Sequence, residues 1–165
     1  DGALNNDRPH NFKLTGFYVQ PFARIGGALT LSLTFTAVSG RPIQVLGAHS
    51  AYGGRQTLIL PPGAGGRTPP ITQFDLHVGY EQRLGGQVRL SVFGDLVNLF
   101  NQQAVTNIDE EYTFSIVSPI LYGKPSDLKR LRTDDGAPLI VNGNYGQPTA
   151  FQAPLMLRLG GRLTF

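Results

Sequence analysis

The sequence predicts an all-β chain: an antiparallel meander of about five long strands that forms the C-terminal part of a transmembrane β-barrel, with two long outer loops. Apolar and polar residues alternate over runs of about twelve residues, whereas ordinary strands run about five or six. Glycine (21 residues) and proline (12 residues) fall mainly between these runs. The last run ends the chain on Phe165, which is typical of outer-membrane barrels and rare in soluble sheets.

The five predicted strands lie near residues 12–22, 28–39, 72–83, 87–100 and 154–165. The first is apolar on both parities at its centre, so the sequence leaves its faces unassigned. The second alternates most cleanly, with threonine and serine between its apolar residues. The third and fourth also alternate, and their apolar positions must face the same way. The apolar positions of these three strands are Leu29, Leu31, Leu33, Phe35, Phe74, Leu76, Val78, Tyr80, Val88, Leu90, Val92 and Leu96.

In the terminal strand, Leu157, Leu159, Leu163 and Phe165 share one face, and Arg158 and Arg162 lie on the other. Twelve tilted residues span on the order of 30 Å along a membrane normal, enough for an apolar band of about 25 Å. We therefore expect the leucines of this strand, together with Leu29, Leu31, Leu33 and Phe35, to lie exposed on a convex, lipid-facing surface.

The connections alternate between short and long. Tight turns near residues 24–27 and 84–86 join strands one to two and three to four, while residues 40–71 and 101–153 form long links. Outer-membrane barrels have short periplasmic turns and long outer loops. This order places Phe165 on the periplasmic side and predicts a protein of the Gram-negative cell outer membrane.

Five strands are too few to close a barrel, because an open sheet leaves two unpaired edges in lipid. The chain also begins at Asp1 without an initiator or a targeting segment. We therefore expect residues 1–165 to be the C-terminal barrel fragment of a longer protein, with residues 1–11 as the tail of another outer loop.

Charged residues occupy the polar face of the last three strands. In a barrel they would face inward, where they either line a solute path or form wall salt bridges and plug contacts. Parity requires an odd-length turn between strands three and four; we predict Leu84-Gly85-Gly86, with Glu81 opposite Arg89 as a cross-strand ion pair. The candidate inner-wall charges are Asp75, Glu81, Arg83, Arg89, Asp95, Arg158 and Arg162.

The sequence offers no catalytic or cofactor motif. No G-x-S-x-G elbow or phosphate loop is present, the three histidines lack metal spacing, and cysteine is absent. The net charge of +3 is dispersed, which argues against nucleic acid binding. We therefore expect no enzyme, no cofactor and no metal site. Asp109, Glu110 and Glu111 are candidate surface-loop contacts for calcium or a cationic ligand; the alternative is a solvated cluster of loop acids.

Several segments resemble the C-terminal barrel region of TonB-dependent outer-membrane receptors, in particular the Oar-like branch. Strand four ends in Asn98-Leu99-Phe100-Asn101, and a long loop and a Pro-led terminal strand follow it. Three loop-to-strand junctions also resemble this branch: residues 7–10, 39–42 and 65–69.

This resemblance implies a plugged barrel of about 22 strands, coupled through TonB to the inner-membrane proton gradient. The implied partners are outer-membrane lipid, upstream strands and plug of the same protein, and TonB through an upstream segment. Phe165 and the leucines Leu157, Leu159 and Leu163 also resemble the C-terminal signal read by the barrel assembly machinery. Two other interpretations stay open: a structural or adhesive surface protein that the barrel only anchors, and a soluble glycan-binding β-sandwich.

Overall fold

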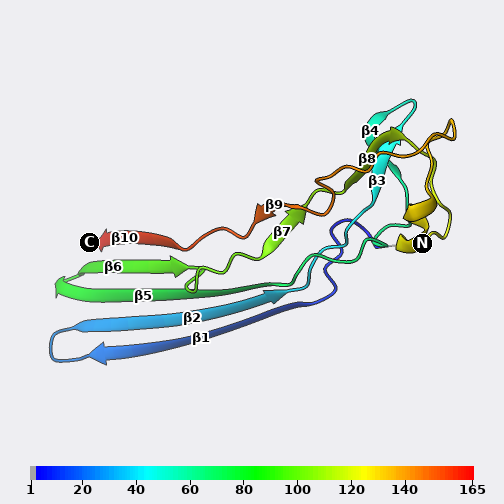
Figure 1. Ribbon diagram of the computed structural model, residues 1–165. Coiled ribbons are helices and arrows are strands. Elements are labelled where there is room, and N and C mark those ends of the chain that lie inside the picture. The colour runs from blue at the N-terminus through cyan, green and yellow to red at the C-terminus, as the bar shows by residue number, and fades with distance from the viewer. Residues whose placement is uncertain (1–2) are drawn as a thin grey trace. The chain divides into compact units, whose positions relative to one another are not determined.

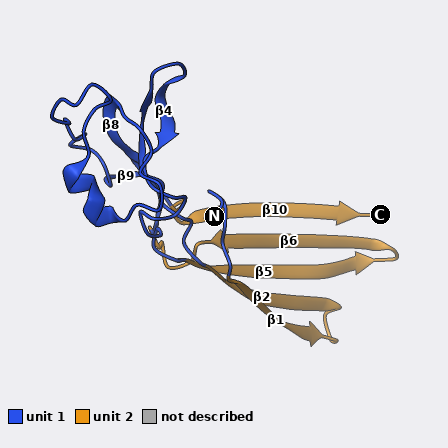
Figure 2. Ribbon diagram, turned by 90° about the vertical axis from the view of Figure 1, so that its right-hand side faces the viewer, with its two compact units in different colours: residues 1–9, 39–70, 104–151 blue, residues 10–38, 71–103, 152–165 orange. Residues whose placement is uncertain are grey.

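The computed structural model describes residues 3–165, which form two compact units. The sheet unit comprises residues 10–38, 71–103 and 152–165, and the described part of the loop unit comprises residues 3–9, 39–70 and 104–151 (Figure 2). Asp1 and Gly2 lie outside the described residues, so the expectation of an incoming outer loop is not assessed there. None of the helices formed by residues 3–165 has the length and apolar character needed to cross a membrane.

Five long strands run side by side in the sheet unit (Figure 1), in the order β1-β2-β5-β6-β10, and every neighbouring pair is antiparallel. The order skips only strands that belong to the loop unit, so the sheet is the predicted meander. This confirms the predicted fold class. The strands are β1 (Asn11–Phe22), β2 (Gly27–Val38), β5 (Ile71–Gly85), β6 (Val88–Val97) and β10 (Met156–Thr164).

The register assigns the faces of β1, which the sequence left open. Leu14 pairs with Phe35 and Tyr18 pairs with Leu31, so the even-numbered residues of β1 lie on the apolar face of β2. Residues paired across a ladder share a face. Phe17, which pairs with Ser32, therefore lies on the polar face.

The predicted register of the β5–β6 hairpin is wrong by two residues. Glu81 pairs with Ser91 and Arg83 pairs with Arg89, whereas Glu81 opposite Arg89 was expected. The turn itself contains only Gly86 and Gln87. A bulge between Arg83 and Gly85 adds the one extra residue that the parity of the two strands requires. Gly85 and Gly86 have positive φ angles of 127° and 55°, which glycine adopts without a Cβ penalty.

The predicted ion pair nevertheless forms along the diagonal. The guanidinium of Arg89 lies 3.4 Å from a carboxylate oxygen of Glu81. Long side chains reach diagonal neighbours across a ladder. The parity argument was therefore correct, but it did not distinguish a three-residue turn from a two-residue turn with a bulge.

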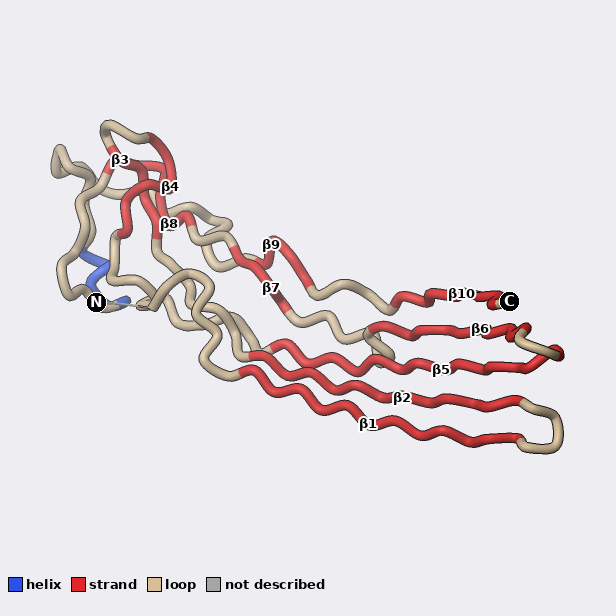
Figure 3. The backbone as a smooth tube through the Cα atoms, turned by 180° about the vertical axis from the view of Figure 1, so that it is seen from behind, coloured by secondary structure: helices blue, strands red, loops and turns tan. Residues whose placement is uncertain are grey.

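The two long connections, expected only as long outer loops, fold together into a unit with its own strands (Figure 3). One sheet has the order β4-β3-β8, and its β3–β8 pair is parallel. A second sheet pairs β7 with β9. The elements are β3 (Leu46–His49), β4 (Gly53–Leu58), β7 (Val105–Ile108), β8 (Glu111–Ile116), the 3-10 helix η1 (Pro125–Arg130) and β9 (Pro148–Phe151).

The loop unit is built around a small apolar core of Val45, Ile59, Leu60 and Val117. Tyr112 and Tyr145 pack edge-to-face beside it, with ring centroids 5.1 Å apart. Burial raises the pKa of the Tyr145 hydroxyl, so the phenol stays neutral to more alkaline pH than in water. The short apolar runs that supply this core come from both long connections, and only tertiary contact joins them.

The observed register makes a direct prediction. Cα atoms of directly paired residues lie about 4.5–5.5 Å apart, within disulfide range, whereas diagonal neighbours lie about 7–8 Å apart. In the full-length protein, the double variant Glu81→Cys/Ser91→Cys should form a disulfide on mild oxidation, detected by altered gel mobility. Glu81→Cys/Arg89→Cys is the control and should remain reduced. Preferential cross-linking of the control pair would restore the register expected from the sequence.

Candidate functional site

The two faces of the five-stranded sheet differ in chemistry over β2, β5, β6 and β10. Register rows on one face join apolar residues from successive strands, for example Leu31 to Val78 and Leu96 to Leu157. The sheet unit contains no second layer of strands and no helix, so neither face packs against another element of this unit. A protein in water buries such a face, whereas a bilayer leaves it in contact with acyl chains.

Most of the leucines expected to be exposed on this face are exposed. Leu33 retains 45% of its accessible surface and Leu159 retains 74%, and Leu157 and Leu163 are also exposed. Leu29, Leu31 and Phe35 are half-buried instead. Phe35 loses exposure to ring contacts within the same sheet, because it lies between Phe12 and Phe74.

Aromatic side chains gather at both ends of the apolar face. At one end, rings form a series from strand to strand, with centroid distances of 6.0, 4.6 and 5.1 Å between successive members. Near the tight turns, the ring centroids of Phe22 and Tyr80 lie 6.5 Å apart. The Tyr18 hydroxyl donates to the side-chain oxygen of Gln20, and the Tyr80 hydroxyl donates to that of Gln82. The members of the first series are Phe12, Phe35, Phe74 and Phe100.

The spacing of these two aromatic groups matches the height of the apolar band of an outer-membrane barrel. Phe12 and Phe22 lie on the same strand with residue numbers that differ by ten. At about 3.3 Å per residue and a tilt of about 40°, this separation gives about 25 Å along the normal, the height of the apolar band of outer-membrane barrels. Tyrosine, with an apolar ring and a hydrogen-bonding hydroxyl, suits the boundary between acyl chains and water.

The opposite face carries all seven candidate inner-wall charges, as their register shows. Asp95 accepts from the ring of His77 at 2.6 Å, and Asp75 accepts from the Gln73 amide and the Asn98 backbone N–H. Glu81 forms the diagonal ion pair with Arg89 that is described above. Within residues 3–165, the remaining three cations of the set form no ion pair: Arg83, Arg158 and Arg162.

Two glycines let rings lie close to the wall on this face. Gly79, Phe93 and Gly160 form one register row. A Cβ on Gly160 would lie 2.3 Å from the Phe93 ring, and one on Gly79 would lie 3.1 Å from the His77 ring. Both rings therefore cover glycine backbone and project less from the sheet than they would beside larger residues.

The Asn98–Asn101 segment ends β6 and fixes the start of β10. Asn98 is 1% exposed and Asn101 is at the surface, and both have left-handed backbone with φ of 55° and 51°. The Asn98 amide donates to the carbonyls of Gln102 and Ala153, and its oxygen accepts from the Gln102 N–H. The Asn101 side chain accepts from the Leu155 N–H at 2.9 Å. Asparagine suits both positions because it tolerates this backbone and replaces ladder hydrogen bonds.

The three loop-to-strand junctions that were singled out in the sequence meet around Arg67. Its guanidinium donates to the carbonyls of Asp7 and Gly40 and pairs with the Asp7 carboxylate at 2.5 Å. Arg41 and Thr68 bond to each other through two hydrogen bonds. A Cβ on Gly40 would lie 1.6 Å from the Thr68 carbonyl, so only glycine fits there. The three junctions are thus joined to one another by hydrogen bonds and an ion pair.

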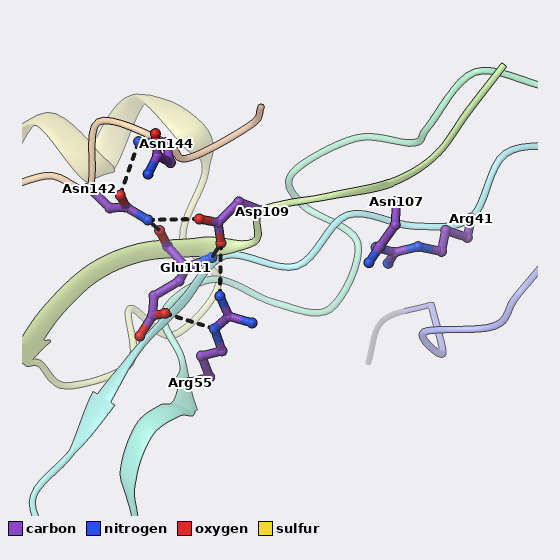
Figure 4. A network of polar contacts seen from close by, with 7 residues as sticks. All are labelled: Arg41, Arg55, Asn107, Asp109, Glu111, Asn142 and Asn144. Atoms are coloured by element: carbon purple, nitrogen blue, oxygen red, sulfur yellow. Dashed lines mark hydrogen bonds and ion pairs between the residues drawn. The ribbon is translucent and has the colours of Figure 1, made fainter. Parts of the chain in front are cut away.

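Each acid of the run 109–111 has a partner within the loop unit, and Figure 4 shows the partners of Asp109 and Glu111. Glu110 accepts from Arg41 and from the Gln44 backbone N–H, both at 2.8 Å. Arg55 donates from Nε to Glu111 at 2.7 Å and from a terminal nitrogen to Asp109 at 3.3 Å. These contacts raise the pKa of the Arg55 guanidinium, chiefly through the hydrogen bond to Glu111.

Asn142 completes this network. Its amide donates to Asp109 at 3.0 Å and to the Glu111 carbonyl at 2.8 Å, and its oxygen accepts from the Asn144 N–H (Figure 4). Such pairing favours a structural role for the acids over a solvated cluster or a cation site. Among residues 3–165, no three or more His, Cys, Asp or Glu side chains are arranged so that they could hold a metal ion. Surface contact by Asp109, Glu110 and Glu111 stays a prediction.

The buried position of Asn98 predicts a large effect on stability. In the full-length protein, Asn98→Ala should lower the free energy of unfolding by about 1–3 kcal/mol more than Asn101→Ala, because it removes three hydrogen bonds made by a buried side chain, whereas Asn101→Ala removes one at an exposed site. Asn101→Ala is matched because it imposes the same backbone strain at an exposed site. Urea titration in detergent or lipid measures the difference, and equal losses would remove the special role of Asn98.

The chain is similar to the TonB-dependent transporter Oar of Myxococcus xanthus, with 37% identity over 179 aligned residues. The alignment covers 99% of the chain and 17% of that relative, so the chain spans less than one fifth of its length. No family model matches the chain, and no solved structure matches it. The identity with Oar and the five-stranded antiparallel sheet together confirm the family resemblance: the chain is a C-terminal segment of the Oar-like branch of TonB-dependent receptors.

Proposed function

We propose that the chain forms the C-terminal wall of an outer-membrane barrel in a TonB-dependent receptor that takes up a solute. The observation that carries this proposal is the one-sided sheet, whose apolar face is bounded by aromatic groups at both ends and whose opposite face is polar. The apolar face contacts lipid, and the polar face lines the interior. The name of the relative supports energised transport rather than catalysis.

The partners follow from this placement. The free edges of β1 and β10 pair with upstream strands of the same protein, because a lipid-exposed edge would leave backbone groups unsatisfied. The inner-wall charges contact the plug or bulk water in the lumen. An upstream segment contacts TonB, and the barrel assembly machinery inserts the protein into the outer membrane.

A second candidate function is adhesion or surface structure, in which the loop unit acts and the barrel anchors it. The specific observation in its favour is that residues 39–70 and 104–151 build a folded unit with a core of its own. The two functions differ in what precedes residue 1: a receptor requires a plug and a TonB-contact segment there.

The lipid-facing assignment is tested by introducing a charge on either face. Leu33→Arg should destabilise the folded barrel by about 2–4 kcal/mol, because Leu33 lies on the apolar face between the aromatic groups. Ser32→Arg places the same charge one residue away, on the polar face opposite His77, and should be tolerated. Heat-modifiable gel mobility of outer-membrane fractions reports the folded barrel. Equal tolerance of both variants would contradict lipid contact.

The chain terminus provides a second test. Deleting Phe165 from the full-length protein should lower its outer-membrane yield more than Phe100→Ala, because the terminal strand is the proposed signal for the assembly machinery. Immunoblots of outer-membrane fractions measure the yield. If both changes lowered the yield equally, the terminal position would carry no special signal.

A further inference from the structure

The charged side chains on the polar face of the sheet do not balance. The registers of β1, β2, β5, β6 and β10 place every charged side chain of these strands except His77 in one of two groups on this face, cations or acids, and the cations are more numerous. The cations are Lys13, Arg83, Arg89, Arg158 and Arg162, and the acids are Asp75, Glu81 and Asp95.

Each of the acids already has a partner in the sheet unit. The Asp95 carboxylate is hydrogen-bonded to the His77 ring at 2.6 Å, and Asp75 accepts from a neighbouring amide and from a backbone N–H. Glu81 forms its ion pair with Arg89 at 3.4 Å. The other cations of the face form no ion pair within residues 3–165, so all of its unpaired charge is positive. They are Lys13, Arg83, Arg158 and Arg162.

These unpaired cations are spread along the face from end to end. Lys13 lies near the start of β1, and Arg83 lies beside the tight turn between β5 and β6. Arg158 and Arg162 lie between these ends on β10. Four residues of a strand cover about 13 Å, so one small anion cannot contact both of these arginines at once. The spacing suits an anion that passes from one cation to the next, as in anion pores lined by arginine and lysine.

The tight-turn end of the face brings two arginines together. Arg83 lies directly opposite Arg89 across the ladder, where like charges destabilise a sheet. Both border an open hollow of about 450 Å³, which is lined by Arg83, Gly86, Gln87, Arg89, Thr164 and Phe165. Within residues 3–165, the terminal carboxylate of Phe165 forms no ion pair with either arginine. An anion in the hollow would offset the repulsion between the two guanidinium groups.

We propose that the polar face is a path for an anionic solute, whose carboxylate or phosphate groups pair in turn with the unpaired cations from Lys13 to Arg83. Such a solute offsets the positive charge of the face, whereas a cationic solute would be repelled along it. The inference rests on the proposed uptake and names the class of solute that is taken up. Acidic groups of the plug are the alternative partner of the same cations.

Rates of thiol modification at Ser91→Cys measure the electrostatic potential of this face. Ser91 lies between Glu81 and Arg162 in one register row, and residues 1–165 contain no cysteine. The full-length protein, with any other cysteine replaced, is placed in lipid nanodiscs. It reacts with a sulfonate-bearing or a trimethylammonium-bearing methanethiosulfonate, and each rate is divided by the rate with free mercaptoethanol. We expect the anionic reagent to be favoured severalfold.

Two variants of Arg162 show whether this preference comes from the unpaired cations. Arg162→Gln removes a unit charge directly opposite the thiol and should lower the ratio of anionic to cationic rates by about fivefold. Arg162→Lys keeps the charge and should preserve the ratio. At equal ionic strength, tripolyphosphate should slow the anionic reagent severalfold more than chloride does, because a polyanion occupies cations that chloride only screens. Gel mobility of the unheated protein checks that each variant retains a folded barrel.

Several outcomes would overturn the proposal. A ratio of one or below, or no response to Arg162→Gln, would mean that acidic groups of the plug already neutralise the cations. A thiol at Ser91→Cys that reacts with neither reagent would mean that protein covers the path, and equal slowing by the two salts would mean that no polyanion binds. Leu33→Cys tests the proposed function separately. It lies on the apolar face, so rapid reaction there would contradict lipid contact whatever the ratio at Ser91→Cys.

Discussion

All five strands of the sheet obey one constraint: the ladder must present the same chemistry on the same face at every strand. A shift of one residue in any pair would turn an apolar face over, so the alternation holds each strand in a register of fixed parity. β1 has apolar residues on both parities, so its own pattern does not set its orientation; its pairing with the alternating strand β2 does. Its Leu14 and Tyr18 pair with Phe35 and Leu31 of β2.

A ladder also needs fixed ends, and polar side chains provide them. Asn98 and Asn101 join the end of β6 to the start of β10, and Arg67 joins three junctions of the loop unit. These residues replace backbone hydrogen bonds where the chain leaves regular structure, which accounts for asparagine, arginine and glycine at these positions. The motifs that supported the family resemblance therefore anchor the chain where regular structure ends.

The strands of the loop unit depend on tertiary contacts more than on local sequence pattern. Its strands are short, and one sheet joins β3 from the first long connection to β8 from the second by a parallel pair. Period-two alternation over four residues is too brief to separate a strand from a loop. The acids 109–111 likewise find their partners in residues that are distant in the sequence, such as Arg41, Arg55 and Asn142.

The sequence alone determined the five long strands and the faces of four of them, because these depend on residue chemistry at a period of two. The alternation of short and long connections gave the meander order, and the motifs at strand ends and junctions gave the family resemblance. Tertiary structure decided what depends on backbone detail or distant partners. It placed a bulge at Gly85 that moved Glu81 opposite Ser91, and it folded the long connections around Val45 and Ile59. A bulge and a two-residue turn have the same parity as a three-residue turn, so the pattern of side chains could not distinguish them.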